Sequence, residues 1–320
     1  MNDRNQPEVL IDPRDHDRPI RMALRGRTAD RTLSRCSAGA LMGLSIAACT
    51  PAFPLNMLTC REGIEISSSI SYAGGPRQTL DVYRSREVQG APVIVFFYGG
   101  SWQGGAKETY LFVAAALAKR GYVTVIPNYR GYPEIRFPVF LEDGAQVVRW
   151  VKQNATQFGG DPARVFLMGH SAGAHIAAML SLDGQWLGGV GLDPRQDIAG
   201  LIGIAGPYDF LPLRDPTLQM IFGGADRENT QPISFVSGGE PPALLLTGRS
   251  DTAVDPGNSA RLVAKLRAAR SDAHEIVYPR VGHLSIIGAF SPVLRFLAPL
   301  LRDVDKFIAR VAARKTSSSP

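Results

Sequence analysis

Apolar and polar positions along this chain alternate between two patterns. Short runs rich in apolar and β-branched residues occur at 67–72, 80–84, 92–97, 122–128, 164–169, 199–205, 242–247 and 274–279. Stretches with helical spacing lie between them, at 108–120, 139–157, 172–182, 256–269 and 291–314. The run 92–97 is continuously apolar, which is typical of a strand buried on both faces. This alternation predicts an α/β fold with a mainly parallel central sheet and helices on both faces.

One segment, residues 208–240, breaks this rhythm between two predicted strands. It is rich in proline and glycine and contains an apolar group at 218–222. Because so many apolar side chains would not stay exposed to water, we expect a small lid-like excursion over the carboxyl edge of the sheet. Met220 and Phe222 are then expected to line a pocket; the alternative is that they pack into the core.

The front of the chain has the pattern of an export signal. Four arginines and one acid, within 22–35, precede an uncharged run at 36–48 that is too short to span a membrane as a helix. We therefore expect a signal peptide region at 1–48, with Met22 as a possible true start, and a linker at 49–65. The main domain is expected at 66–315 and a disordered tail at 316–320. The alternative is that 36–48 is a buried helix.

The uncharged run ends in Ile46-Ala47-Ala48-Cys49, which resembles the lipobox of bacterial lipoproteins. This resemblance implies cleavage before Cys49 and lipidation of its thiol. The protein would then be an exported lipoprotein of the bacterial cell envelope, facing the periplasm, and would meet the membrane only through that anchor. The alternative is that Cys49 is an ordinary thiol.

Composition and charge exclude several other classes of protein. Apolar residues make up 45% and charged residues 20% of the 320 positions, as in ordinary globular proteins. The net charge of +6 is spread along the chain without a long basic stripe or a nucleic-acid-binding motif, so no nucleic-acid partner is expected. The three cysteines (Cys36, Cys49 and Cys60) match no metal or redox spacing, and no metal is expected.

The motif Gly169-His170-Ser171-Ala172-Gly173 has the form G-x-S-x-G and lies between a predicted strand and a predicted helix. In that context the serine occupies a strained turn at the sheet edge and acts as a nucleophile. The turn also places Ser171 at a helix N-terminus, where the partial positive charge favours a developing oxyanion. We therefore predict Ser171 as the nucleophile.

A second glycine motif, Tyr98-Gly99-Gly100-Ser101-Trp102, directly follows the strand at 92–97. Glycines there allow backbone N–H groups to point into a site without an intervening side chain. Gly99 and Gly100 are therefore predicted, with Ala172, to form an oxyanion hole. Tyr98 and Trp102 are expected to contribute to the substrate pocket.

A serine nucleophile requires a base and an acid to orient that base. His283 follows the strand 274–279 and so lies at the same sheet edge as the serine, whereas His274 opens that strand at the opposite edge. We expect His170 to point away from the serine and His175 to pack against the sheet. Asp251 follows the strand 242–247 and is the predicted acid.

Asp255, four residues later in the same loop, is the rival candidate for the acid. Either residue satisfies the chain order of nucleophile, acid and histidine.

With these elements in order, the sequence resembles the α/β-hydrolase carboxylesterases, near the bacterial feruloyl and acetyl-xylan esterases and the hormone-sensitive-lipase-like enzymes. The likeness covers roughly residues 65–300, and its most specific stretches are at 128–133, 137–138, 142–143 and 159–162. It implies a serine hydrolase of short-chain carboxylic esters with a small ester substrate and no cofactor. Tyr98 departs from the pattern because a histidine is usual there.

Two other functions fit parts of this pattern. An arylformamidase-like C–N hydrolase shares the same triad and a similar glycine loop. A catalytically inactive envelope binding protein on a hydrolase scaffold would not need the intact serine and histidine. The sequence does not specify the oligomeric state.

Overall fold

The structure, a computed structural model, describes residues 53–317. The expected signal region at 1–48, the expected lipidation site Cys49 and the last three residues of the expected tail lie outside this range. Within it, eight strands form one sheet in the order β1-β2-β4-β3-β5-β6-β7-β8. The strands are β1 (Ile64–Ser71), β2 (Thr79–Ser85), β3 (Ala91–Phe97), β4 (Val123–Pro127), β5 (Gly160–His170), β6 (Gly200–Ile204), β7 (Ala243–Gly248) and β8 (Ala273–Tyr278).

The sheet is mainly parallel, as predicted. β1 and β2 pair antiparallel with each other, and β2 pairs antiparallel with β4, while the pairs from β4 to β8 are all parallel. β3 and β4 are almost completely buried, which explains why β3 is continuously apolar and β4 is apolar except for Thr124. Because the parallel strands run in one direction, the loops that follow them meet at a single edge of the sheet.

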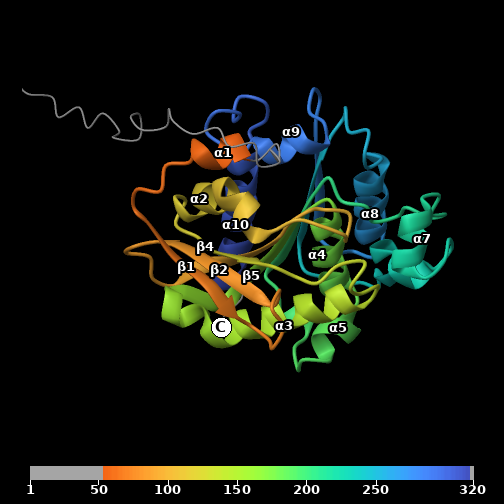
Figure 1. Cartoon of the computed structure of the whole chain (residues 1–320), viewed down its shortest axis with the longest axis horizontal. Coiled ribbons are helices and arrows are strands. Elements are labelled where there is room, and N and C mark those ends of the chain that lie inside the picture. Colours follow the sequence, from red (N-terminus) through yellow and green to blue (C-terminus); the bar gives the residue numbers. More distant parts are fainter. Residues whose placement is uncertain (1–52, 318–320) are drawn as a thin grey trace, which may run out of the picture. The chain divides into compact units, whose positions relative to one another are not determined.

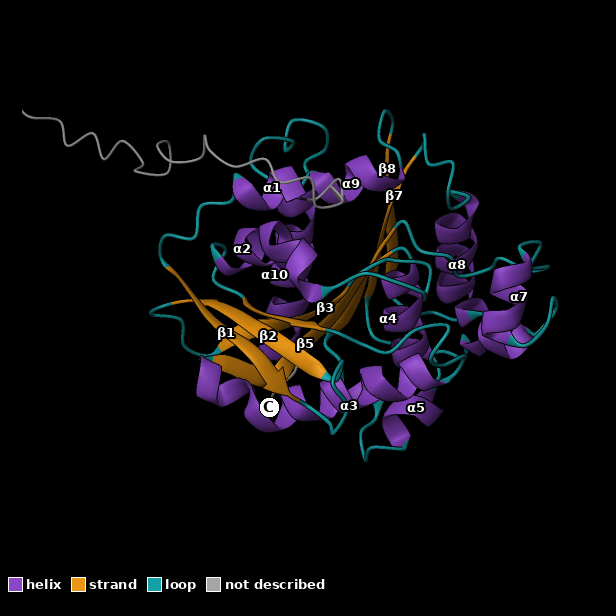
Figure 2. Ribbon diagram, in the orientation of Figure 1, coloured by secondary structure: helices purple, strands orange, loops and turns teal. Residues whose placement is uncertain are grey.

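Helices cover both faces of the sheet (Figures 1 and 2). On one face lie α2 and α10, and on the other lie α3, α4 and α8. The longer helices are α2 (Leu111–Ala118), α3 (Val139–Asn154), α4 (Ala172–Leu182), α8 (Gly257–Ala268) and α10 (Leu300–Ser317). The shorter elements are α1 (Phe53–Met57), η2 (Lys107–Tyr110), η3 (Ala155–Phe158), α5 (Gly184–Gly188), α6 (Pro194–Asp197), α7 (Pro216–Phe222), η4 (Glu228–Thr230), η5 (Pro232–Phe235) and α9 (His283–Gly288).

Three expected boundaries were wrong. The expected linker 49–65 contains α1 and the start of β1, and α1 packs against α2. The helix expected at 291–314 begins only at Leu300, because Pro299 lacks the N–H needed inside a helix. That helix continues through 316–317, which we expected to belong to the disordered tail.

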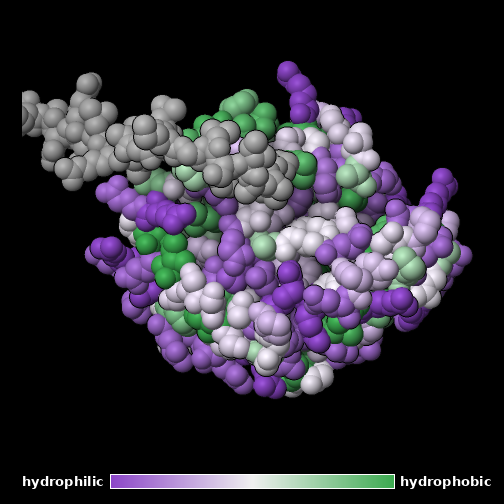
Figure 3. All heavy atoms as spheres, viewed as in Figure 1, coloured by the Kyte–Doolittle hydropathy of each residue, from purple (hydrophilic) through white to green (hydrophobic). Residues whose placement is uncertain are grey.

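The surface carries a limited group of exposed apolar side chains. Val293 and Phe296 are 49% and 80% exposed in the segment between α9 and α10, where Figure 3 shows apolar residues at the upper edge of the molecule. Within residues 53–317, no helix is both long and apolar enough to cross a membrane.

Candidate active site

Ser171 lies on a sharp turn between β5 and α4. Its φ of 55° and ψ of −124° are strained for a residue with a side chain. The turn is so tight that a Cβ added at Gly169 would lie 2.1 Å from the carbonyl oxygen of Gly173, and one added at Gly173 would lie 2.0 Å from that of Phe97. Both glycines of the motif are therefore required by the close approach of the backbone.

Three side chains predicted from separate parts of the sequence meet at the carboxyl edge of the sheet. His283, the first residue of α9, places its Nε2 2.9 Å from Oγ of Ser171. Its Nδ1 lies 2.8 Å from Oδ2 of Asp251, which follows β7. The Asp251 side chain is completely buried, and its Oδ1 accepts hydrogen bonds from the N–H groups of Ala253 and Val254, both at 2.9 Å. The carboxylate is thus held rigidly against the imidazole.

The rival carboxylate, Asp255, is placed differently. Its side chain is 64% exposed and forms an ion pair with Arg261 at 3.1 Å. Its Oδ1 also accepts a hydrogen bond from the N–H of Gly257, and these two interactions lower the pKa of Asp255. The structure therefore places Asp251, and not Asp255, beside His283.

The other histidines within residues 53–317 do not contact the serine hydroxyl. His274, at the amino end of β8, pairs with Asp272 at 2.8 Å. His175 is fully buried, and its Nε2 lies 2.8 Å from the carbonyl oxygen of Thr230 in the excursion. Its ring is surrounded by aromatic rings of Trp102, Phe140, Phe210 and Phe222. It therefore packs under the excursion rather than simply against the sheet.

His170 makes no contact with the serine hydroxyl, in line with the expectation that it points away from the serine, but its ring packs against His283. The two ring centroids are 4.8 Å apart, and Nε2 of His170 lies 3.0 Å from the carbonyl oxygen of His283. Burial and then the nearby charge of His283 lower the pKa of His170 to about 3. The position between glycine and serine in the motif is thus occupied by a neutral ring that touches the base.

The glycine loop lies directly against the nucleophile. A Cβ added at Gly99 would be 2.9 Å from Cβ of Ser171, so the loop can approach this closely only with glycine. Ala172 is the first residue of α4, so its N–H has no acceptor within the helix and is free to stabilise an oxyanion. The cavity beside the serine is lined by Ser101 and Trp102, the two residues that follow Gly100. Ser101 is therefore a further candidate donor, which only the position of the loop reveals.

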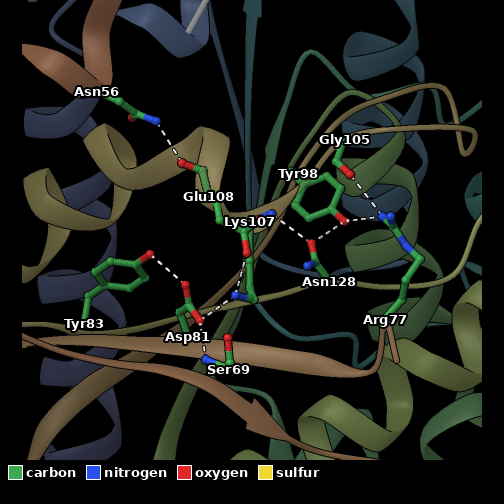
Figure 4. Close-up of polar contacts among 10 residues, drawn as sticks. All are labelled: Asn56, Ser69, Arg77, Asp81, Tyr83, Tyr98, Gly105, Lys107, Glu108 and Asn128. Atoms are coloured by element: carbon green, nitrogen blue, oxygen red, sulfur yellow. Dashed lines mark hydrogen bonds and ion pairs between the residues drawn. The ribbon is translucent and has the colours of Figure 1, made fainter. Parts of the chain in front are cut away.

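Tyr98 does not line the pocket, contrary to the expectation. Its ring is fully buried and stacked between Tyr110 and Tyr129. Its hydroxyl donates to Oδ1 of Asn128 at 2.9 Å and lies 3.3 Å from Nη2 of Arg77, as Figure 4 shows. Tyr98 thus supports the start of the glycine loop from within the core.

The support behind the loop continues into a buried ion pair. Nζ of Lys107 lies 2.7 Å from Oδ1 of Asp81, and both side chains are almost completely buried. The backbone N–H of Lys107 donates to the same Asn128 oxygen at 2.8 Å (Figure 4). Nζ of Lys107 also pairs with Oε1 of Glu108 at 2.7 Å. Because removal of Lys107 would leave the buried charge of Asp81 unpaired, this cluster fixes the segment that follows the glycine loop.

A cavity of about 580 Å³ opens beside Ser171 and His283. Trp102 lines it as predicted, and part of the excursion forms a wall, but Met220 and Phe222 do not line it. Phe222 is fully buried among aromatic rings, and Met220 is 45% exposed on the outer side of α7. The lining residues are Ser101, Trp102, Ser171, Pro207, Asp209, Phe210, Leu211, Pro212, Leu213, Arg214, Asp215, Leu218, Ala253, Val254, Asp255, Asn258, Arg261 and His283.

The sequence did contain a signal for this wall. Asp215-Pro216 has the form of a helix N-cap followed by proline at the first helical position, and α7 begins there. Helical spacing then places Leu218, Ile221 and Phe222 on one face and Met220 on another. Within the described residues, no group of three or more histidine, cysteine, aspartate or glutamate side chains could hold a metal ion.

The chain is similar to proteins of known type. The model of the BD-FAE family matches residues 80–266. Esterase LipC of Mycobacterium tuberculosis is 28% identical over 67% of this chain and 58% of its own length. The isoprenylcysteine alpha-carbonyl methylesterase ICME of Arabidopsis thaliana is 29% identical over 69% of this chain and 57% of its own length. This chain therefore spans a little over half the length of these two curated relatives.

Solved structures show the same α/β-hydrolase fold. A truncated carbohydrate esterase from gut microbiota superposes with a TM-score of 0.68 at 22% identity, covering 78% of this chain and 96% of that one. Esterase B from Lactobacillus rhamnosis superposes with a TM-score of 0.69 at 19% identity, covering 81% of this chain and 90% of that one. At these identities the likeness concerns the fold.

Proposed function

This chain belongs to the BD-FAE family, and we propose that it is a serine hydrolase that cleaves short-chain carboxylic esters through an acyl-enzyme. The observation that carries the proposal is the continuous contact from Ser171 through His283 to Asp251, at 2.9 and 2.8 Å, beside an open cavity. The esterase relatives named above support the same class of reaction.

In the first half of this mechanism, Oγ of Ser171 attacks the ester carbonyl carbon while Nε2 of His283 accepts the hydroxyl proton. Asp251 keeps the other imidazole proton on Nδ1 and stabilises the imidazolium that forms. The N–H of Ala172 and those of the glycine loop stabilise the oxyanion. The imidazolium then gives its proton to the departing alcohol, which leaves an acyl group on the serine.

The second half repeats these steps with water as the nucleophile. His283 accepts a proton from the water, which attacks the acyl carbon, and the carboxylic acid leaves as the proton returns to Oγ. We assign the acyl group to the part of the cavity next to Trp102 and the excursion. A volume of about 580 Å³ exceeds what a short acyl group needs, so the alcohol part of the ester has room in the same cavity.

The direct test uses Ser171→Ala with p-nitrophenyl acetate and a fluorophosphonate probe. We expect loss of both turnover and labelling at an unchanged thermal midpoint, with a residual rate on the order of 10³-fold over water from the remaining site. Wild-type turnover in the variant would exclude the mechanism. An unlabelled wild-type protein would instead favour a binding protein, and preference for formyl-kynurenine over esters would favour a C–N hydrolase.

We also propose that the protein is exported and carries a lipid on Cys49, a residue outside the described range. The arginine-rich and uncharged segments ahead of Cys49 support export. Labelling with radioactive palmitate, with Cys49→Ala as the control, tests the lipid; labelling that survives the substitution would exclude it.

A further inference from the structure

The ring of His170 lies where three parts of the site meet. The residue ends β5 and directly precedes the nucleophile. Its ring packs 4.8 Å from that of His283, and its Nδ1 lies 3.1 Å from the point where a Cβ of Gly99 would be. The side chain is therefore enclosed by the nucleophile turn, the glycine loop and the segment that carries the base.

One hydrogen bond connects the His170 ring to the main chain of His283 and defines which ring nitrogen is protonated. Nε2 of His170 lies 3.0 Å from the carbonyl oxygen of His283, and since a carbonyl oxygen can only accept, Nε2 carries the proton. Nδ1 is buried without a hydrogen-bond partner among the described residues, as expected for the unprotonated nitrogen of a neutral ring. The ring thus links the strand of the nucleophile to the main chain of the base.

His283 needs such a link because it lies at the start of a short helix, α9. α9 has six residues, and the segment before it is joined to the acid's loop by a hydrogen bond from the N–H of Ser250 to the carbonyl of Val281, at 3.0 Å. That bond positions the base relative to the acid but not relative to the serine. The 2.9 Å contact between Nε2 of His283 and Oγ of Ser171 depends on the two main chains staying in register.

We propose that His170 is a positioning residue that holds the main chain of His283 at the distance from Ser171 that proton transfer requires. This inference rests on the proposed esterase function. His170 touches neither the serine hydroxyl nor the cavity, so its effect acts through the placement of the base. Its neutral state also keeps a second positive charge away from the imidazolium that forms on His283.

The test compares His170→Leu with His170→Gln, which are similar in size but differ in that only glutamine carries a side-chain N–H donor. Since a misplacement of about 1 Å can cost about 10²-fold, we expect the leucine variant to lose between about 10- and 100-fold in kcat. KM should stay within about twofold, because substrate binding does not use this contact. Glutamine should restore most of kcat, and the rate of fluorophosphonate labelling should follow kcat.

Controls separate positioning from folding and from the proposed function itself. His274→Gln makes the same replacement at the opposite edge of the sheet and should leave kcat unchanged. If the leucine variant does not fold, His170→Asn takes its place, because its amide is one methylene too short to reach the carbonyl. A wild-type kcat in His170→Leu would overturn the proposal. Equal losses of kcat in His170→Leu and His170→Gln would overturn it as well. An inactive wild-type protein would contradict the esterase function instead.

Discussion

Replacing Asp251 by asparagine should put the proton of His283 on the wrong ring nitrogen while leaving the shape of the site unchanged. Oδ1 of Asp251 accepts two backbone N–H groups at 2.9 Å, so the amide oxygen of asparagine would take that place. The amide NH₂ would then face Nδ1 of His283, which lies 2.8 Å from Oδ2 in the native protein. Because NH₂ can only donate, it would force the imidazole proton onto Nε2, where it blocks proton transfer from the serine.

The size of this effect follows from the wrong tautomer. The equivalent change in a serine–histidine–aspartate site lowers kcat by about 10⁴-fold, or about 5.5 kcal/mol of transition-state stabilisation. We expect a loss of this order in Asp251→Asn, measured as kcat on p-nitrophenyl acetate. The folded structure should persist, since the two backbone hydrogen bonds remain.

Asp255→Asn provides the matched control. It makes the same change four residues away in the same loop, at a side chain that lines the cavity but pairs with Arg261. An exposed ion pair of this kind contributes about 0–1 kcal/mol, so we expect a kcat close to that of the wild-type protein. A loss below about tenfold in Asp251→Asn, or a larger loss in Asp255→Asn, would refute the assignment of the acid.

Three further tests concern the cavity wall, the buried His175 and the nucleophile turn. Leu218→Ala should shift acyl chain-length preference by roughly tenfold or more, because apolar walls discriminate by about 1–3 kcal/mol per methylene, whereas Met220→Ala should leave the profile unchanged. Burial lowers the pKa of His175 from 6.5 to about 4, so the unfolded chain binds more protons between these values. His175 should therefore lower the stability in urea by about 1.4 kcal/mol per pH unit between about pH 6.5 and pH 4, and His175→Gln should reduce the measured slope by that amount. Gly173→Ala should lower both the thermal midpoint and turnover, because its Cβ would meet a carbonyl oxygen at 2.0 Å, whereas Gly184→Ala, with nothing within 4 Å, should change neither. An equal shift in chain-length preference for Met220→Ala and Leu218→Ala would contradict the assignment of the wall. A pH dependence of stability that His175→Gln leaves unchanged would contradict the argument about His175, and wild-type stability and turnover in Gly173→Ala would contradict the argument about the turn.

The sequence by itself determined the strands, the helices between them and the order of the predicted nucleophile, acid and base. These features depend on local patterns: apolar runs, helical spacing and glycines around a serine. Because parallel strands end at one edge of the sheet, residues that follow β5, β7 and β8 had to come near one another. Ser171, Asp251 and His283 were therefore predictable without knowing any side-chain contact.

The local sequence pattern predicted only part of the cavity wall. Apolar content predicted that the excursion covers something, and residues 209–215 and Leu218 do line the cavity. Which apolar side chains face the cavity depends on the rotation of α7 about its axis. That rotation is set by the aromatic rings against which Phe222 packs, and it turns Met220 outward.

Only the tertiary structure decided the roles of Tyr98 and His170. Tyr98 is bound to Asn128, 30 residues along the chain, and His170 to His283, 113 residues along. No periodicity or motif encodes contacts across such separations, because they arise when residues at the ends of different strands meet at one edge of the sheet. The residue type shows that a buried polar side chain needs a hydrogen-bond partner. Only the tertiary structure determines which residue is that partner.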